Sequence, residues 1–352
     1  MIGAMAARLG PSRGGGAGRD PQPIATVQPQ DQTASCDAAD SGNLSEQHKG
    51  SRTCRRAFAM NRRQWKPARH SEKRTRPVSK RSARHPAPLS RNPLLVIDGD
   101  SFAHRSYHAL PKTILRRGRK PAGAILGFAN MLLRFYRDEQ PRAVLVAWDT
   151  LDVPTYRHEK FPAYQSGREF DDALLEQLDV LPEFVAACGF QNAKAPGFEA
   201  DDFLATAAAA EEKRGGTVLI ASGDRDTFQL ASDHTTILYP LRAGEMARIS
   251  PAEVRTRYGV EPAQVPDFIA LRGDPSDKVP GAPGVGATGA ATLLQRYGCL
   301  EAALEAGRFS AMAERLRLFR SLATMNRKAP LPSLRSQKPT WYKQPHSLES
   351  GS

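Results

Sequence analysis

Three short hydrophobic runs along the chain each lead into an aspartate. The runs and their acidic ends are residues 94–97 with Asp98, residues 143–148 with Asp149, and residues 217–221 with Asp224. Unbroken runs of this length, rich in Val and Ile, are typical of parallel strands that are buried on both faces. Because ligands of an open α/β sheet bind beyond the carboxyl ends of its strands, we expect these three carboxylates to meet at one edge of the sheet.

Segments with helical spacing of apolar residues separate these runs, and shorter strand-like segments lie among them. Helices are predicted at residues 101–109, 124–137, 172–188 and 199–213, and short strands at 190–193, 235–239 and 246–249, the last two at a sheet edge. The segment 111–121 is interpreted as a basic loop, and the chain from 250 to about 324 as mostly helical. This order predicts an α/β fold with a mostly parallel central sheet flanked by helices, followed by a helical C-terminal part.

Further acidic residues follow in the same part of the chain. They are Glu199, Asp201, Asp202, Asp226, Asp274 and Asp277. Two carboxylates ~5 Å apart at an effective dielectric of ~20 repel by roughly 3 kcal/mol, so a cluster of them needs a counter-charge. Hard divalent cations with oxygen ligands supply one, and an acid cluster without His or Cys favours Mg²⁺ or Mn²⁺ over Zn²⁺. Two such ions about 3.5–4 Å apart are the arrangement used by enzymes that cleave phosphodiesters.

Each of these acidic residues, taken alone, also has a purely structural explanation. Residues 199–202 form a favourable first helical turn because the helix N-terminus is partly positive, and an aspartate after a strand often caps a helix or forms a turn. Asp100 and Asp172 are interpreted in this way. For the other acids, the combination of three strand ends, an acidic helix start and two close aspartate pairs favours a metal site.

One segment rich in Gly and Pro joins two predicted helices. Residues 273–286 read GDPSDKVPGAPGVG, and the next helix is predicted to begin at residue 287. Glycines leave backbone N–H groups uncovered, and the helix N-terminus adds positive potential, so such a turn can hold a nucleic-acid phosphate without side chains. The alternative is a plain helix–helix linker, which does not explain so many glycines and prolines beside an acidic pair.

The formal net charge of +13 is concentrated at the N-terminus. Residues 1–92 carry 18 Lys and Arg against 6 Asp and Glu, whereas the rest carries 32 against 31. Because this tail has almost no Val, Ile or Phe, we expect it to be disordered, with a basic second half able to touch nucleic acid nonspecifically. The alternative is that the tail has no role or is not translated, with Met60 as the start. Residues 331–352 are polar and are predicted to be a flexible C-terminal tail.

The spacing of the cysteines and the length of the apolar runs indicate the cellular location that we expect for the protein. The four cysteines lack CxxC spacing, which indicates neither a disulfide framework nor a zinc site and fits a reducing, cytoplasmic location. No apolar run approaches the ~18 residues that a membrane span needs, so no membrane partner is expected.

Several of these segments, taken in chain order, resemble the 5′→3′ exonuclease domain of bacterial DNA polymerase I, a member of the flap endonuclease superfamily. The matching segments are residues 95–99, 105–110, 148–149, 155–159, 197–202, 222–226 and 273–286. The resemblance covers most of residues 94–328, and no polymerase domain follows it, so a free-standing exonuclease is expected. It implies a PIN-like nuclease core at 93–250 with an arch near 152–170. It also implies a helical DNA-binding part at 251–330 that contains a helix–three-turn–helix motif.

The resemblance also implies roles for particular residues. Nine acids would be catalytic and metal-binding: Asp98, Asp149, Glu199 and Asp201 for a first ion with Asp202 beside them, and Asp224, Asp226, Asp274 and Asp277 for a second. A monomer acting on DNA 5′ ends, flaps and nicked or gapped duplex is implied, with K⁺ as a further cation at the helix–three-turn–helix. Residues implied to contact DNA are Arg105, Tyr164, Gln165, Arg168, Gly281, Gly284 and Gly286.

The chain departs from the family pattern at two places. Gln165 stands where the family usually has a lysine that reaches the scissile phosphate, and it keeps a hydrogen-bond donor without the charge. The motif after Asp277 has Lys278 where asparagine is usual, and residues 287–289 read Ala-Thr-Gly in place of Glu-Lys-Thr.

The leading hypothesis is therefore a metal-dependent 5′→3′ exonuclease or flap endonuclease of DNA replication and repair. A PIN-type ribonuclease shares the acidic α/β core, but the Gly281–Gly286 turn and the helical C-terminal part argue against it. A DNA-structure-binding protein with weak or lost cleavage is the third possibility. Gln165 motivates it, and the complete acid set is the main objection.

Overall fold

A computed structural model describes residues 92–167 and 169–340 of the chain. The prediction of a disordered basic tail therefore falls, except for its last residue, outside the described residues. The same holds for the predicted DNA contact of Arg168 and for the last twelve residues of the predicted C-terminal tail.

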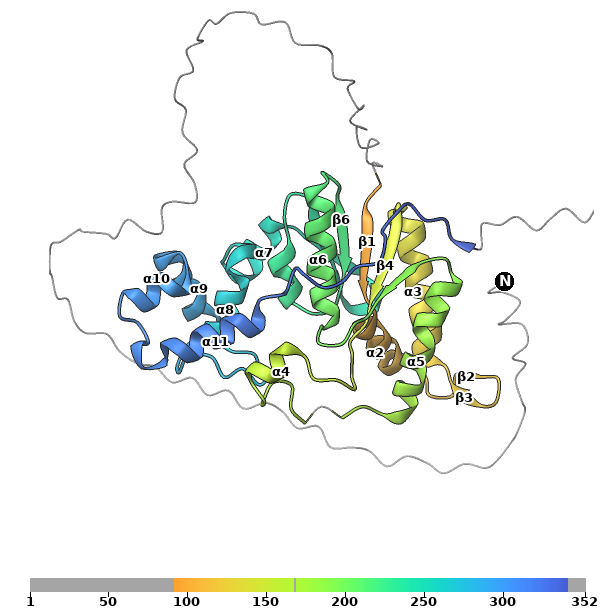
Figure 1. Cartoon of the computed structure of the whole chain (residues 1–352), viewed down its shortest axis with the longest axis horizontal. Coiled ribbons are helices and arrows are strands. Elements are labelled where there is room, and N and C mark those ends of the chain that lie inside the picture. The colour runs from red at the N-terminus through yellow and green to blue at the C-terminus, as the bar shows by residue number, and fades with distance from the viewer. Residues whose placement is uncertain (1–91, 168, 341–352) are drawn as a thin grey trace, which may run out of the picture. The chain divides into compact units, whose positions relative to one another are not determined.

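The centre of the described part is a six-stranded sheet with the order β5-β4-β1-β6-β7-β8 (Figure 1). The strands are β1 (Leu94–Asp98), β4 (Ala143–Ala147), β5 (Gln191–Ala193), β6 (Val218–Ala221), β7 (Thr235–Pro240) and β8 (Met246–Ile249). All neighbours in this sheet pair in parallel except β7 and β8, which confirms the predicted, mostly parallel sheet. The chain adds β4 and β5 on one side of β1 and β6 to β8 on the other. The topological switch point, where ligands bind in such sheets, therefore lies at β1.

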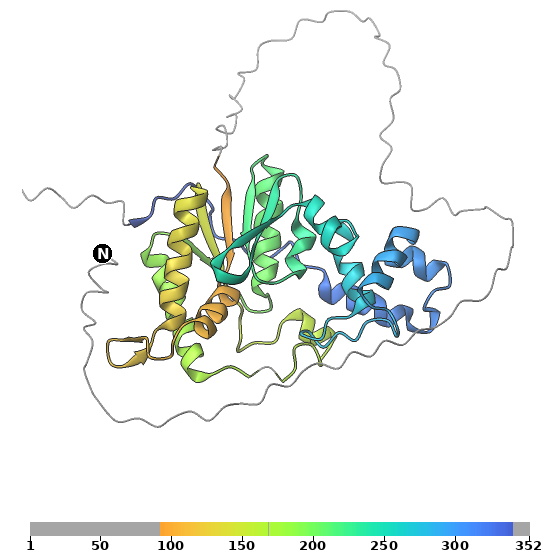
Figure 2. The ribbon, with the colours of Figure 1, turned by 180° about the vertical axis from the view of Figure 1, so that it is seen from behind.

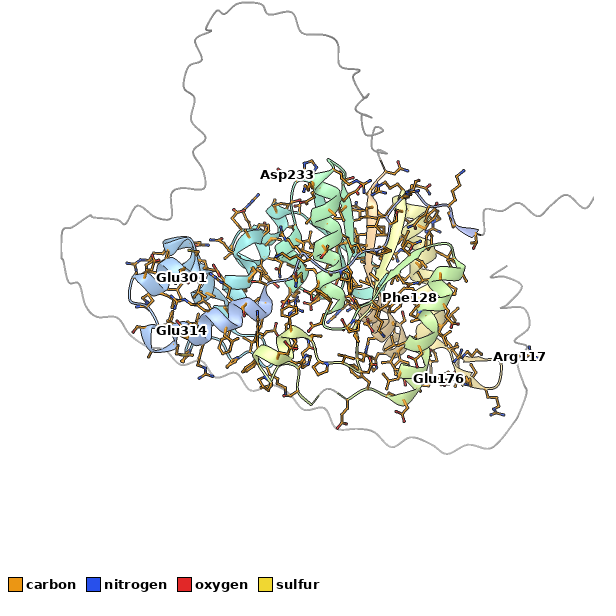
Figure 3. The ribbon with its side chains drawn as sticks, viewed as in Figure 1. Arg117, Phe128, Glu176, Asp233, Glu301 and Glu314 are labelled. Carbon is orange, nitrogen blue, oxygen red and sulfur yellow. The ribbon has the colours of Figure 1, made fainter. Side chains whose placement is uncertain are left out.

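Alternate side chains of β1 enter two different apolar cores. Leu95 and Ile97 pack with the helices α2 (Gly99–Ala109), α3 (Gly123–Glu139) and α5 (Asp172–Ala187), whereas Leu94 and Val96 pack with α6 (Ala200–Lys213). Figures 1 and 2 show these helices on the two sides of the sheet. Phe128, labelled in Figure 3, lies in the α3 layer with its ring centroid 5.6 Å from that of Trp148. Burial on both faces explains why the strands read as unbroken apolar runs.

The predicted helical C-terminal part packs on the α6 side and continues its core. Its helices are α7 (Pro251–Tyr258), α8 (Val265–Arg272), α9 (Ala287–Tyr297), α10 (Leu300–Glu305) and α11 (Ala313–Ala323). Phe268, Leu294 and Phe319 are buried in the same cluster as the α6 residues. The turn 273–286 thus joins two helices that are anchored to the sheet layer. Among the described helices, none has both the length and the apolar character needed to cross a membrane.

Two segments have more structure than their sequence pattern indicates. The basic loop 111–121 contains an antiparallel ribbon of β2 (Leu115–Arg116) and β3 (Lys120–Pro121), with Arg117 at its turn (Figure 3). Strands of two residues are too short to produce a recognisable alternation, so the ribbon was not predictable. The weakly patterned arch segment contains one short helix, α4 (Tyr156–Lys160).

Residues 331–340 form an extended strap, here called the C-terminal strap, which packs along the amino end of β4. The Arg142 guanidinium donates to the Leu334 carbonyl at 2.7 Å, and the Gln337 N–H donates to the Arg142 carbonyl at 2.8 Å. The Val144 N–H donates to the Gln337 side chain at 3.0 Å. Residues 331–340 of the predicted flexible tail therefore have defined contacts with the segment that leads into β4. Leu331 and Leu334 also pack on the core, and the Gln337 side chain satisfies the Val144 N–H of β4.

Candidate active site

A cavity of about 640 Å³ opens beyond the carboxyl ends of the central strands. Its acidic lining residues are Asp98, Asp100, Asp149, Glu199, Asp201, Asp224, Asp226 and Asp274. The structure thus brings together seven of the nine predicted acids. The two exceptions, Asp202 and Asp277, are described below.

The strand ends place the first carboxylates rigidly. Asp98, the last residue of β1, caps α2 by accepting the Ser101 N–H at 3.0 Å and also accepts the Ser222 hydroxyl at 2.7 Å. Asp149 follows β4 and accepts the N–H of Ala200, the first residue of α6, at 2.7 Å. These bonds hold both side chains at the sheet edge, because each links a strand end to the start of a helix.

Glu199 lines the cavity but is held by three neighbouring donors. The Thr155 hydroxyl donates to it at 2.8 Å and the Tyr164 hydroxyl at 3.1 Å, while Arg157 forms an ion pair with it at 3.1 Å. Tyr164 is buried rather than exposed on a DNA-facing surface. Burial, reinforced by the charge of Glu199, raises the pKa of the Tyr164 phenol well above its ordinary value, so the phenol stays protonated and donates. Tyr164 thus contacts Glu199 from the interior, and its predicted contact with DNA stays a prediction.

Burial and mutual repulsion raise the pKa of several carboxyls in the cavity. Burial, with the charges of Asp149 and Asp224 adding to it, raises the pKa of Asp98 to about 7 against the hydrogen bonds from Ser101 and Ser222. Burial, followed by nearby aspartates, also raises the pKa of Asp201 and Asp226 well above the usual range. Without a counter-charge, these groups cannot all be ionised together.

Asp100 belongs to this group, although its sequence position indicated only a favourable helical turn. Its side chain accepts the Asp149 N–H at 2.7 Å and lines the cavity. Burial and the charge of Asp149 raise the pKa of Asp100 well above its ordinary value. The signal available in the sequence was its place two residues after Asp98, at the strand end.

Asp202 lies outside the cavity and is completely buried. It accepts the Arg157 guanidinium at 2.9 Å, the Tyr156 hydroxyl at 3.2 Å and the Asn326 N–H at 2.8 Å. One helical step after Asp201 turns a side chain by about 100°, which takes Asp202 from the cavity into the interior. Asp202 therefore differs from the other predicted metal ligands in its surroundings, and its metal-binding role stays a prediction.

Asp277 is connected to the cavity lining by a hydrogen bond from Gln165, a residue of the arch. Its carboxylate accepts the Gln165 side-chain amide at 3.0 Å, and Gln165 itself lines the cavity.

The predicted contact residue Arg105 is exposed on α2. It lies beside Gly223 of the cavity lining, with its guanidinium 3.6 Å from the position that a Cβ added to Gly223 would take.

The three predicted phosphate-binding glycines differ in what surrounds them. Gly281 has φ +74°, and a Cβ there would lie 2.4 Å from the Gly273 nitrogen, so this glycine is required by the fold. Gly284 and Gly286 have no atom within 4 Å of an added Cβ, so the protein leaves space beside their backbone.

Sequence reasoning missed the cationic and aromatic residues of the cavity wall. Arg225 and Arg272 line it, and the Arg272 guanidinium lies 3.3 Å from the Asp274 carboxylate. His104 and Phe170 also line it, with ring centroids 5.3 Å apart. None of these residues has a distinctive spacing in the sequence, since α2 and the arch bring them together only in the fold.

The side chains of the cavity suit hydrated divalent cations. The atoms that its acidic residues offer to a cation are all oxygens, and burial with mutual repulsion raises the pKa of Asp98 and Asp201. Among the described residues, no three His, Cys, Asp or Glu side chains are arranged to enclose one ion by themselves.

The raised pKa of Asp98 predicts an unusual pH dependence of stability. A carboxyl whose pKa rises on folding binds its proton more tightly in the folded state, so its contribution is full below about pH 4 and is lost as the pH approaches about 7. In a chelator, we expect the melting temperature to fall from about pH 5 to about pH 7.5. Saturating Mg²⁺ should flatten this decline, because the cation replaces the proton as counter-charge. Thermal melts with and without chelator test this, and identical profiles would contradict it.

Comparisons with known proteins agree with this arrangement. The model of the family domain "5'-3' exonuclease, N-terminal resolvase-like domain" matches residues 93–259, and that of "5'-3' exonuclease, C-terminal SAM fold" matches residues 260–344. DNA polymerase I of Mycobacterium bovis is 41% identical over 215 residues, which are 60% of this chain and 24% of that protein. Thermostable DNA polymerase I of Thermus thermophilus is 40% identical over 209 residues, which are 59% of this chain and 24% of that protein. The chain thus spans about a quarter of the length of these relatives.

Solved structures show the same fold at lower identity. T5 5'-exonuclease with bound zinc ions matches at a TM-score of 0.56 and 19% identity, covering 66% of this chain and 89% of that one. A T5 protein co-crystallised with metal ions matches at a TM-score of 0.56 and 18% identity, with the same coverage. With both parts of the family matched in order over residues 93–344, the chain belongs to the 5′–3′ exonuclease family.

Proposed function

We propose that this chain is a divalent-metal-dependent 5′ nuclease that hydrolyses DNA phosphodiester bonds at 5′ ends or flaps in replication and repair. The observation that carries the proposal is the cavity in which eight acidic side chains meet at the switch point of the sheet. Its support from relatives is twofold. The curated relatives of the matched region are DNA polymerases, and the T5 5'-exonuclease structure contains zinc ions.

In this proposal, the acidic residues of the cavity form two cation sites and the arginines of its wall attract the phosphate. Asp98, Asp149, Glu199 and Asp201 would hold one cation. Asp224, Asp226 and Asp274, together with Asp277 beside Gln165, would hold the other. Bound cations supply a water of lowered pKa and neutralise charge that develops on the phosphate. Arg225 and Arg272 on the cavity wall attract the negatively charged phosphate. We favour Mg²⁺ or Mn²⁺ for an all-oxygen site, and K⁺ at the turn 281–286, with the protein acting as a monomer.

The helical part from α7 to α11 provides the duplex-binding surface in this proposal. The open space beside Gly284 and Gly286 lets a phosphate approach their backbone N–H groups, next to the start of α9. Arg105, exposed near the cavity, provides a further phosphate contact.

The glycine turn gives a direct test of this surface. Gly286→Val should lower the melting temperature only modestly, because an added Cβ has no atom within 4 Å and the main cost is a less favourable N-cap residue for α9. It should weaken binding to flap and nicked duplex more than to single strands, since the side chain occupies the position of the phosphate. Fluorescence anisotropy on the two substrate types measures this difference. Equal losses on both, or none, would show that the turn is only a linker.

Cleavage assays test the proposed function as a whole. The purified protein is incubated with labelled flap, nicked, blunt-duplex and RNA substrates in Mg²⁺, in Mn²⁺ and in excess chelator. We expect cleavage near the 5′ end or flap junction of DNA only when a divalent cation is present. Cleavage confined to RNA would favour a PIN-type ribonuclease, and tight flap binding without cleavage would favour a structure-binding protein. Full cleavage in chelator would contradict the mechanism.

A further inference from the structure

Gln165 joins the two predicted groups of acids through one chain of hydrogen bonds. Its side-chain amide donates to the Tyr164 hydroxyl at 2.9 Å and to the Asp277 carboxylate at 3.0 Å. The Tyr164 hydroxyl in turn donates to Glu199 at 3.1 Å. We propose that Gln165 is a positioning residue that fixes Asp277 relative to Glu199 and thereby sets the affinity of the second cation site.

The backbone of the arch holds Gln165 in the place that this role requires. Gln165 has φ +51°, in the left-handed region that few non-glycine residues adopt. Its N–H also points to the Asp277 carbonyl at 3.4 Å, so backbone and side chain contact the same residue. Two independent contacts between segments 112 positions apart in sequence link the arch to the turn after α8.

The position of Gln165 between two cavities supports the same role. It lines both the acid cavity and a neighbouring cavity of about 360 Å³ on the arch side, and both cavities also share Asp149 and Glu199. A side chain in this wall influences the cation sites without having to be a ligand. Partners that orient metal-binding carboxylates typically change metal affinity 10- to 100-fold when they are removed.

The absence of charge on glutamine is part of the proposal. A lysine here would stand beside Asp277 and Glu199 and would compete with cations for the same carboxylates. The amide keeps the donor function and adds no positive charge. In this chain, the side chain at position 165 therefore orients the acidic residues and does not place a positive charge beside the phosphate.

The test measures metal binding without DNA, and it rests on the proposed function because it assumes two cation sites. Mn²⁺ is titrated into the full chain by calorimetry and by electron paramagnetic resonance. We expect Gln165→Met, which keeps the size but loses the donor, to weaken one of the two Mn²⁺ sites about 10-fold or more and to leave the other site unchanged. Tyr164→Phe, which breaks the same chain of bonds at its next link, should weaken Mn²⁺ binding as well.

Gln264→Met is the matched control. Gln264 also donates through its amide, to the Gly298 carbonyl at 2.7 Å, but it lies in the helical part and outside the acid cavity. Its Mn²⁺ affinities should equal those of the wild type. Unchanged affinities in Gln165→Met, or equal weakening of both sites together with a fall in melting temperature, would overturn the inference. A wild-type protein that binds no Mn²⁺ would instead overturn the proposed function.

Discussion

Asp201→Asn is expected to slow cleavage by at least about 10²-fold and, at the same time, to raise the melting temperature of the metal-free protein. The rate falls because a carboxylate that would hold a cation becomes neutral. The stability rises because burial and the charges of Asp224 and Asp98 make an ionised Asp201 costly, as the raised pKa of its carboxyl shows. A substitution that slows the reaction and stabilises the fold indicates that the original residue is retained for its chemical function.

Single-turnover cleavage of a labelled flap and thermal melts in chelator measure the two effects. Binding of flap DNA should be retained, since the substitution removes negative charge from the site. Asp233→Asn is the control, because Asp233 is exposed before β7 and away from the cavity (Figure 3). Wild-type cleavage by Asp201→Asn would remove Asp201 from the proposed mechanism, and a lower melting temperature would contradict the repulsion argument.

Asp202→Ala is expected to cost about 3–5 kcal/mol of unfolding free energy, because it removes one of the two carboxylates that pair with the buried Arg157 guanidinium. The side chain of Arg157 is 3% exposed and that of Asp202 is fully buried. The loss also frees the Tyr156 hydroxyl and the Asn326 N–H, so the start of α6 loosens from the arch and from the segment after α11.

Chemical denaturation and the yield of soluble protein test this second prediction. Asp138→Ala provides a comparison on the surface, where the pair with Arg137 should contribute little. If Asp202→Ala kept wild-type stability but lost Mn²⁺ binding, the carboxylate would be a ligand after all, and its structural role would be wrong.

Much of the fold could be predicted because burial on both faces leaves a direct trace in the sequence. β1, β4 and β6 read as unbroken apolar runs, and their carboxyl ends identified Asp98, Asp149 and Asp224 as neighbours. Such runs are local, so no knowledge of the partner strands was needed. Helices with one apolar face, such as α3 and α5, were recognisable for the same reason.

The errors concern features that depend on contacts between distant segments. Asp201 and Asp202 are adjacent in sequence and chemically alike, and the sequence does not show which of them the helix turns toward the cavity and which toward the buried Arg157. The C-terminal strap looks like a tail because its polar residues satisfy the backbone of β4 rather than forming a pattern of their own. Asp100 was discounted because its burial against Asp149 becomes visible only once β1 and β4 are paired.

The C-terminal strap and the acid cavity lie at opposite ends of one strand. Arg142 precedes β4 and holds the strap, whereas Asp149 follows β4 and lines the cavity, roughly 23 Å away at about 3.3 Å per residue. β4 is hydrogen-bonded to β1 and β5, so a disturbance at the strap reaches the cavity only through a well-supported strand. Natural substitutions in the strap should therefore change the amount of folded protein in the cell. The cleavage rate of each folded molecule should stay the same.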